Sequence, residues 1–528
     1  TALTSGVITL QLNCLGLVPM VLKVPVLIEG DGTDENGTWI HWSAIQHQTT
    51  PQTPLVSIKE DTTQYGQIWY PNMAFGFQSK PSAQTTLFKN ATVWTNEKEG
   101  ILKGADVLVV DGKIKQVSRQ NLTAPSGATI IDATGLHLTS GIIDEHSHIA
   151  ISKGVNEGGQ AISAEVSIAD VVNPDDIDIY RQLSGGVTAA QLLHGSANPI
   201  GGQSALIKLK WGVTADELLI SNAPKFIKCA LGENVKQANW GDFNTVRFPQ
   251  TRMGVEQVFY DGFYRAKAYD AEWAAYKSGK SSTAPRVDLE LEVLSQILHS
   301  ERYITCHSYV QSEINMLMHV ADSMGFKINT FTHILEGYKV ADKMQKHGVA
   351  GSTFSDWWAY KFEVNDAIPY NAALMTNQGI TVCINSDDAE MGRRLNQEAA
   401  KTIKYGGLTE EQAWKLVTLN PAKVLHLDNR MGSIKAGKDA DLVLWTTNPL
   451  SIEAKVKLTM IEGTVYYDEQ QQIEKLQPLI AKERTRILTL MLAANQKGEG
   501  SKLPQKKVKK HYHCDTLGEE ATASENTH

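Results

Sequence analysis

Cysteine is scarce in this chain of 528 residues, which contains only five: Cys14, Cys229, Cys306, Cys383 and Cys514. Their number is odd, they lie far apart, and none belongs to a Cys-x-x-Cys pair. The sequence therefore excludes a disulfide framework and a cysteine-based zinc module. Three of the five lie in apolar, strand-like runs, where a free thiol behaves as a small hydrophobic side chain.

Long apolar runs and an excess of positive charge are also missing. The longest apolar stretch, residues 14–28, is interrupted by Pro19, Lys23 and Pro25, whereas a membrane span needs about 20 apolar residues. The 50 Lys and Arg residues face 58 Asp and Glu residues, which gives a net charge of −8. We therefore expect neither a membrane span nor a dedicated nucleic-acid-binding protein.

An initiator Met is absent, as is a basic segment followed by an apolar core of the kind found in signal peptides. We interpret the chain as processed, or as a piece of a longer one, and on that ground expect an extracytoplasmic location, periplasmic or secreted. Residues 1–86 contain no chemical motif. We expect them to form an N-terminal appendage, either a structural addition or the remnant of a preceding domain.

Two stretches that lie far apart in the sequence share a β pattern. Residues 87–140 alternate short apolar runs with turn residues, and Asp111-Gly112 between two such runs predicts a tight hairpin. Residues 430–470 return to this pattern. We expect the two stretches to form one small composite β-sandwich, and residues 471–528 to form a C-terminal helix and a polar tail.

Between these flanks, residues 141–429 alternate apolar runs with helical patterns. Strands that alternate with helices indicate parallel βαβ units, and eight such strands predict an α/β fold, a (β/α)8 TIM barrel. The eight predicted strands are residues 141–144, 187–193, 205–209, 226–231, 303–306, 328–331, 349–353 and 380–384. Strand 205–209 is the least regular, because only a glycine-rich loop precedes it.

Four histidines and one aspartate stand where these predicted strands end. His146 and His148 end the first strand, and because they are two residues apart their side chains face the same way. His307, His333 and Asp387 end later strands in the same manner. Barrel active sites lie at the carboxyl ends of strands, and imidazole together with carboxylate suits Zn²⁺, Mn²⁺ or Fe²⁺. The pattern predicts a catalytic metal centre with open coordination positions.

These residues belong to a set of longer motifs. The set includes Leu-Thr-Ser-Gly-Ile-Ile-Asp-Glu-His-Ser-His at 138–148, Asn-Ser-Asp-Asp at 385–388, Leu-Asn-Pro-Ala at 419–422, and the glycine- and lysine-rich turn and strand at 432–443. The set spans residues 87–470 and resembles the metal-dependent amidohydrolase superfamily, which includes imidazolonepropionase, dihydroorotase and N-acetylglucosamine-6-phosphate deacetylase. It is most similar to the imidazolonepropionase-like group, some members of which are longer chains with additional N-terminal sequence.

The resemblance implies a role for each ligand. His146 and His148 would bind one metal ion together with Asp387, and His307 and His333 would bind a second. In a mononuclear variant, one of these last two histidines would bind the metal and the other would contact substrate. One or two Zn²⁺ ions are expected, with Mn²⁺ or Fe²⁺ as alternatives.

A two-metal site in this superfamily also needs a bridging carboxylate, which comes from a glutamate or a carboxylated lysine on a middle strand. Glu233 stands just past the predicted strand 226–231, whereas Lys228 lies deeper in the same strand. We therefore prefer Glu233 as the bridge and keep carboxylated Lys228 as the alternative.

The expected chemistry is hydrolysis of a C–N bond in a small molecule, either a cyclic amide or a peptide-like compound. A metal-bound hydroxide would attack, with Asp387 as the proton shuttle. Tyr309, two residues after His307, is a candidate for stabilising the oxyanion. The candidate substrate contacts at the mouth are His194, Gln203 and Trp357.

Two enzymatic alternatives use the same site, namely deamination and cleavage of Xaa-Pro dipeptides. An alternative of another class is a non-catalytic scaffold or binding protein that has kept the barrel. The expected partners are a small-molecule substrate, a second copy of the chain in a homo-oligomer, and a missing N-terminal region.

Overall fold

The computed structural model describes residues 27–33, 38–45, 68–152, 154–241, 247–357, 359 and 361–498. The chain divides into two compact units, Thr1–Gly66 and Gln67–His528, which are considered separately. Within the described ranges, no helix is both long enough and apolar enough to cross a membrane.

The described part of the first unit is an antiparallel pair of strands. Strand β1 (Leu27–Thr33) pairs with β2 (Trp39–Ile45) along its whole length. The boundary of the appendage differs from the expected residue 86, because residues 68–85 belong to the second unit. There, the ring centroid of Phe75 lies 5.2 Å from that of Tyr180, and the Phe75 carbonyl accepts a hydrogen bond from Trp211 Nε1.

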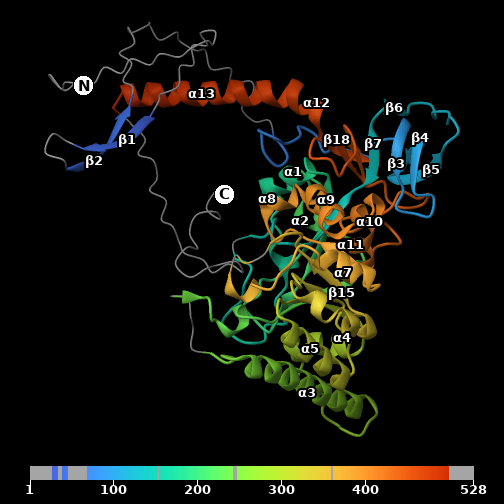
Figure 1. Cartoon of the computed structure of the whole chain (residues 1–528), viewed down its shortest axis with the longest axis vertical. Coiled ribbons are helices and arrows are strands. Elements are labelled where there is room, and N and C mark those ends of the chain that lie inside the picture. Colours follow the sequence, from blue (N-terminus) through green and yellow to red (C-terminus); the bar gives the residue numbers. More distant parts are fainter. Residues whose placement is uncertain are drawn as a thin grey trace. The chain divides into compact units, whose positions relative to one another are not determined.

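An eight-stranded mixed sheet combines strands from both flanks of the second unit. Its strands are β3 (Thr86–Trp94), β4 (Ile101–Val110), β5 (Lys113–Ser118), β6 (Thr129–Asp132), β7 (His137–Ser140), β17 (Leu442–Trp445), β18 (Val456–Ile461) and β19 (Thr464–Asp468). The order is β19-β18-β17-β7-β3-β4-β5, and β6 pairs with β3. Strand β17 runs antiparallel to β7, so the two flanks meet at the middle of the sheet (Figure 1).

The hairpin predicted at Asp111-Gly112 is confirmed. Both residues adopt a left-handed backbone, with φ of +50° and +74°, and they join β4 to β5. The composite origin of the domain is also as expected. The two-layer sandwich is not confirmed, because the described residues form a single sheet here.

The remainder of the unit is built from parallel strands and helices. The seven parallel strands are β8 (Ile142–Ser147), β9 (Val187–Leu192), β12 (Lys225–Ala230), β13 (Arg302–His307), β14 (Thr330–Thr332), β15 (Ala350–Thr353) and β16 (Val382–Ile384). Strand β8 pairs with β9, and β12 to β16 pair in chain order.

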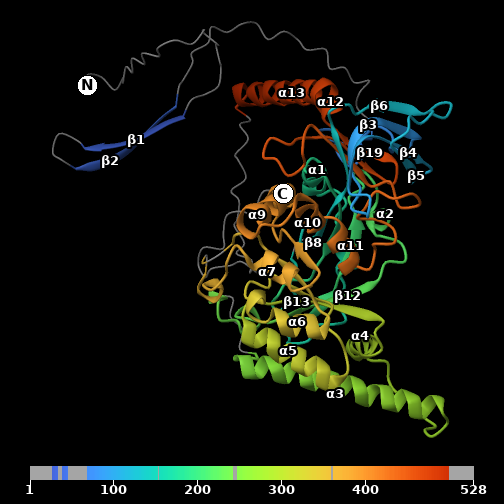
Figure 2. The same ribbon diagram turned by 45° about the vertical axis from the view of Figure 1, so that its right-hand side comes forward.

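Helices follow or separate these strands. They are η2 (Ile168–Val171), α1 (Ile177–Leu183), α2 (Ala215–Leu218), η3 (Asn234–Lys236), α3 (Arg252–Lys277), α4 (Leu289–Leu298), α5 (Gln311–Met324), η5 (Gly337–Lys339), α6 (Ala341–His347), η6 (Phe362–Val364), α7 (Asn371–Asn377), α8 (Ala389–Gly392), α9 (Leu395–Gly406), α10 (Glu410–Lys415) and α11 (Leu419–Val424). Figure 2 shows α3, α4 and α5 gathered at the end of the unit away from the eight-stranded sheet.

The chain ends, within the described residues, in α12 (Glu469–Gln471), a π-helical turn η7 (Gln472–Leu476) and the long helix α13 (Gln477–Gln496). The predicted C-terminal helix is therefore present. The predicted polar tail beyond residue 498 lies outside the described residues.

The prediction that residues 205–209 form a parallel strand of the barrel is wrong. Residues 200–208 form two short strands, β10 (Ile200–Gln203) and β11 (Ala205–Lys208). Strand β10 pairs antiparallel with β12, and β11 pairs antiparallel with β9, so this segment bends between two sheets. No hydrogen-bonded ladder joins β16 to β8 among the described residues, so the strands do not form one closed barrel.

A buried lysine ties the barrel-like part to the eight-stranded sheet. Lys208 Nζ lies 2.7 Å from Asp439, 2.8 Å from Asp441 and 3.0 Å from Glu462, and the side chain is 1% exposed. Burial alone would lower the pKa of Lys208, but the Asp441, Asp439 and Glu462 carboxylates raise it above its usual value. The ammonium group therefore stays charged and holds three acids together.

We expect the Lys208→Met variant to lose about 3–5 kcal/mol of unfolding free energy, because it leaves buried carboxylates without their cation. Unfolding in urea, monitored by tryptophan fluorescence, measures this loss of unfolding free energy. The matched control is Lys210→Met, because the Lys210 side chain is 21% exposed and lies 2.7 Å from Glu462. Its loss should stay below about 1 kcal/mol. Equal losses in both variants would contradict the assigned role.

Candidate metal centre

The five predicted ligands stand at the carboxyl ends of four parallel strands. His146 lies in β8 and His148 follows it, His307 ends β13, His333 follows β14, and Asp387 follows β16. Four of the five are fully buried, and the side chain of His148 is 8% exposed. Since the strands run in parallel, their carboxyl ends bring these side chains to one place.

Asp387 lies at the middle of this cluster. Its Oδ1 is 3.2 Å from His146 Nε2 and 3.0 Å from His148 Nε2, and its Oδ2 is 3.4 Å from His333 Nε2. The ligand atoms of His146, His333 and Asp387 all lie within 4.8 Å of one another. This spacing allows two imidazoles and a carboxylate to bind one divalent ion.

His307 stands beside this tight group. Its ring centroid lies 4.9 Å from that of His333. The described residues offer no hydrogen bond to either ring nitrogen of His307. Buried polar atoms without a partner are costly and call for an explanation, such as an ion that is not part of the protein. The residues present therefore fit a divalent metal.

Burial sets the protonation states of the ligands. It lowers the pKa of His146 and of His307 well below the usual value, and that of His333 to about 3, so it favours the neutral form of all three imidazoles. Burial would raise the pKa of Asp387, but His333 and His146 hold it well below its usual range. Neutral imidazoles and an ionised carboxylate are the forms that bind metals.

The backbone around Asp387 is held by the first strand of the cluster. The Asp144 carboxylate accepts hydrogen bonds from both the backbone N–H and the hydroxyl of Ser386, and Asp387 N–H donates to the His146 carbonyl over 3.0 Å. Burial raises the pKa of Asp144 to about 7. Asp144 was not predicted as a site residue, although it lies two residues before His146 in the motif at 138–148.

The outer ring nitrogens of two ligands have partners that orient the rings. His146 Nδ1 pairs with Thr332 Oγ1 at 3.0 Å, and His148 Nδ1–H donates to the Leu193 carbonyl over 2.9 Å. Such contacts leave Nε2 of each ring to face the metal position. Thr332 gives no sequence signal of its own, since only the fold places it under His146.

The two candidate bridging residues lie in different surroundings. Lys228 is buried, and its Nζ lies 3.2 Å from His146 Nε2. The Glu233 carboxylate instead lies 3.2 Å from Lys361 Nζ. The reason is that the ligands lie below the mouth of the strands, so a lysine inside β12 reaches them, whereas a residue past its end does not.

Aromatic side chains form one wall of the cluster. Tyr309 is fully buried and packs edge-to-face on His307, with centroids 4.5 Å apart. Phe354 stacks on His333 at 4.8 Å, and Trp357 stacks on Phe354 at 4.5 Å. Tyr309 therefore touches a candidate ligand directly, and Trp357 stacks on Phe354, which in turn stacks on His333.

Lys361 was not predicted and lies against this wall. Its Nζ is 4.6 Å from the centre of the Tyr309 ring, and its charge lowers the pKa of both His307 and His333. No motif marks this lysine in the sequence, because it comes from a loop after β15 that only the fold brings to Glu233.

Two predicted substrate contacts are held by the backbone. His194 Nε2 accepts a hydrogen bond from Glu157 N–H over 2.8 Å, and its Nδ1–H donates to the Gly195 carbonyl over 2.8 Å. Burial lowers the pKa of His194 to about 4. The Gln203 amide donates to the Ala164 carbonyl over 3.1 Å. Both side chains therefore fix neighbouring loops, and His194 has no ring nitrogen left for substrate.

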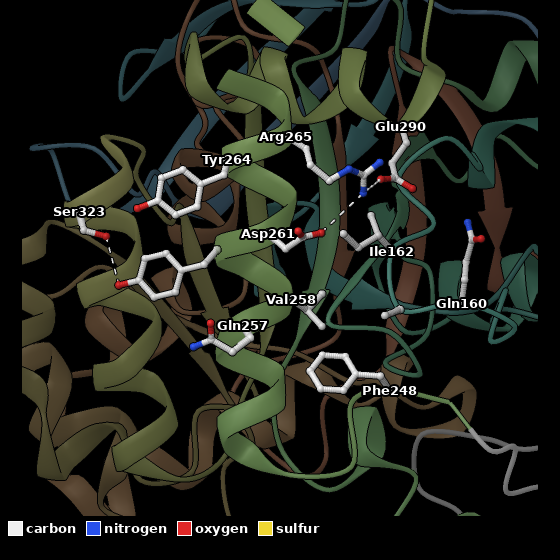
Figure 3. A pocket seen from close by; sticks show the side chains of 12 residues that line it. Gln160, Ile162, Phe248, Gln257, Val258, Asp261, Tyr264, Arg265, Glu290 and Ser323 are labelled. Atoms are coloured by element: carbon white, nitrogen blue, oxygen red, sulfur yellow. Dashed lines mark hydrogen bonds and ion pairs between the residues drawn. The ribbon is translucent and has the colours of Figure 1, made fainter. Parts of the chain in front are cut away.

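A cavity of about 1050 Å³ on the outer face of α3 contains none of the five ligands. Figure 3 shows Arg265 between Glu290 and Asp261 on its wall, with Tyr264 and Phe248 nearby. Arg265 Nη1 lies 2.8 Å from Glu290 Oε1. This cavity is thus separate from the metal centre.

Known proteins resemble this chain along most of its described length. The profile of the Amidohydrolase family matches residues 309–466. A crystal structure of an amidohydrolase from Thermotoga maritima MSB8 is 33% identical with a TM-score of 0.66, and the match covers 73% of this chain and 100% of that chain. The chain belongs to the amidohydrolase family. The resemblance noted from the sequence motifs is thereby confirmed.

Two curated relatives differ in how much of their length is matched. Amidohydrolase tasK of Hapsidospora irregularis is 31% identical over 434 residues, which is 74% of this chain and 44% of that protein. An imidazolonepropionase of Thermoplasma volcanium is 21% identical over 403 residues, which is 71% of this chain and 93% of that protein. This amidohydrolase thus spans less than half the length of the Hapsidospora relative.

We expect the His146→Ala variant of this amidohydrolase to bind divalent metal more than about 100-fold more weakly than the wild type, because it removes a ligand itself. Competition with a chromophoric chelator, together with elemental analysis, measures the change. His299→Gln is the control, because His299 is an exposed histidine outside the cluster. Unchanged affinity in His146→Ala, at an unchanged melting temperature, would remove His146 from the ligand set.

Proposed function

We propose that this amidohydrolase is a metal-dependent hydrolase that cleaves a C–N bond in a small amide, either a cyclic amide or a peptide-like compound. The observation that carries the proposal is the ionised Asp387 carboxylate among neutral imidazoles at the carboxyl ends of parallel strands. We also propose that β8, β9 and β12 to β16 form the barrel-like arrangement of this family, with residues 200–208 linking β9 and β12 through antiparallel pairing.

The proposed metal ligands are His146, His148, His333 and Asp387, with His307 binding a second ion or the substrate. Zn²⁺ is the preferred ion, and Mn²⁺ or Fe²⁺ accept the same ligands. A divalent ion at this position supplies Lewis acidity toward a carbonyl oxygen and toward water.

Asp387 is the proposed proton carrier. Its carboxylate is ionised in the resting enzyme, so it can accept a proton from the attacking water and pass it to the leaving nitrogen. Tyr309 is the proposed donor to the carbonyl oxygen, because its ring packs against His307. Burial of the ligands keeps bulk water away and strengthens these electrostatic contacts.

Lys228 is the proposed bridge between two metal positions, in its carboxylated form. The neutral amine adds to carbon dioxide, so a bond forms between Nζ and carbon, and one proton is released. Its closeness to His146 Nε2 supports this assignment over Glu233, which is paired with Lys361.

The Lys228→Met variant should bind metal at least about tenfold more weakly, because it cannot supply a bridging carboxylate. Glu233→Gln is the matched variant and should stay within about twofold of the wild type. After removal of metal at low pH, uptake by the wild type should be faster when bicarbonate is present. Weak binding in Glu233→Gln combined with normal binding in Lys228→Met would reverse the assignment.

The remetallated enzyme should hydrolyse at least one member of a panel of cyclic amides, Xaa-Pro dipeptides and amino-substituted heterocycles. Asp387→Asn should lower kcat/KM on that substrate by about 10²–10⁴-fold, because it removes the proton carrier. Asp388→Asn is the adjacent control, since Asp388 caps α8 and Asn caps equally well. Release of ammonia alone would favour a deaminase. Full metal loading without any activity would favour the scaffold alternative.

A further inference from the structure

A second cavity, of about 730 Å³, lies at the junction between the eight-stranded sheet and the helices α10 and α11; we call it the junction cavity. The residues that line it come from the turn after β3, from the end of α10, from α11 and its following turn, and from the turn before β17. They are Asn96, Glu97, Lys98, Lys415, Leu419, Lys423, Asp428, Asn429, Lys435, Ala436, Gly437 and Lys438.

The lining of the junction cavity is strongly positive. It contains five lysines and two carboxylates, an excess of three formal positive charges, in a chain whose net charge is −8. Lys435 and Lys438 share one carboxylate, that of Glu97, at 3.6 Å and 3.8 Å. Like charges gathered in a concave surface reinforce one another and attract counter-ions.

Three of the lysines form no ion pair in the described part of the chain. Lys98, Lys415 and Lys423 form no ion pair with any described carboxylate. Structural lysines in this protein are different, since Lys208 at the same junction is matched by three carboxylates. The unmatched charges therefore are not explained by stability of the junction itself.

The part of the cavity lining that Lys438 forms is held in place by hydrogen bonds. Lys438 is buried, and its Nζ donates to Ser433 Oγ over 2.6 Å and to the Met431 carbonyl over 3.2 Å. Burial lowers the pKa of Lys438, and the charge of Lys435 adds to this effect. An ammonium group fixed in a low-dielectric wall interacts with an anion more strongly than a mobile surface lysine does.

We propose that the junction cavity binds a small oxyanion that carries two or more phosphate or carboxylate groups. The volume is that of a site for a small molecule. The lysines supply donors from several directions, which suits an anion with separated charged groups.

This site is distinct from the metal centre. The Asn96 amide donates to Thr418 Oγ1 over 2.9 Å and lies against Ser140, which precedes β8. His146 is six residues further along the chain, near the opposite end of that strand, a span of at most about 20 Å, and none of the metal-centre residues lines the junction cavity. The metal ligands therefore do not take part in the proposed binding.

A bound anion would join two parts of the unit. Lys98 belongs to the turn after β3 of the sheet, whereas Lys415 and Lys423 belong to helices of the barrel-like part. A ligand that binds only the folded arrangement raises the melting temperature, and the rise grows with the logarithm of the ligand concentration above Kd. Stabilisation is thus a readout that does not depend on catalysis.

The test is isothermal titration calorimetry on the full chain, with pyrophosphate and citrate as separate probes at constant ionic strength. We expect one binding site per chain for at least one probe, and a higher melting temperature at saturation. The Lys415→Gln/Lys423→Gln double variant should bind that probe at least about tenfold more weakly. A response to pyrophosphate alone would identify a phosphate ligand, and a response to citrate alone a carboxylate ligand.

The control is Lys267→Gln/Lys280→Gln, which removes the same charge from exposed positions outside the cavity. It should bind the probe as the wild type does. No saturable binding of either probe by the wild type would overturn the proposal. Equal weakening in the two double variants would also overturn it, because it would indicate non-specific attraction.

Discussion

The negative charge of Asp387 is held at the point where four parallel strands end, away from water. Burial alone would convert this carboxylate to the neutral acid, but His333 and His146 lower its pKa far below the usual value. The same burial keeps the imidazoles neutral. Two opposing effects therefore prepare the site: burial favours the neutral imidazoles and the surrounding histidines favour the ionised carboxylate, and each of these forms offers a lone pair to a cation.

The position of that charge depends on strained backbone. Asp387 and His333 both have a left-handed conformation, with φ of +49° and +63°. Each such residue costs about 1–3 kcal/mol and persists only where its surroundings hold it. Strand β8 holds the first, because Asp144 binds Ser386 and the His146 carbonyl binds Asp387 N–H. Strand β8 and the residue directly after it thus carry two of the candidate ligands, and β8 anchors a third.

The ligands were predictable from the sequence because strand ends in a parallel fold share one edge, and local alternation shows where strands end. The direction of residues 200–208 was not predictable, since it depends on which distant strands β10 and β11 meet. Which of Lys228 and Glu233 lies nearer to His146 was not predictable for a related reason. The position of a residue along β12 does not by itself give the position of its terminal atoms, because the long side chain of Lys228 extends to His146. Glu233 pairs instead with Lys361, which comes from a loop far away in sequence.

The junction between the sheet and the helices shows two ways of using lysine side by side. Lys438 and Asp439 are consecutive, yet Lys438 lines the junction cavity, whereas Asp439 binds Lys208 in the buried network. In that network the three carboxylates face four cations, and charges of opposite sign nearly balance: the carboxylates are those of Asp439, Asp441 and Glu462, and the cations are Lys113, Lys208, Lys210 and Arg430. In the lining of the junction cavity, by contrast, five lysines face two carboxylates, although the turn that supplies Lys438 to the cavity also supplies Asp439 to the buried network. The turn can therefore hold lysines and carboxylates in paired form, as it does at Asp439. The excess of lysines in the junction cavity is thus not imposed by the turn, and a bound anion would supply the missing negative charge.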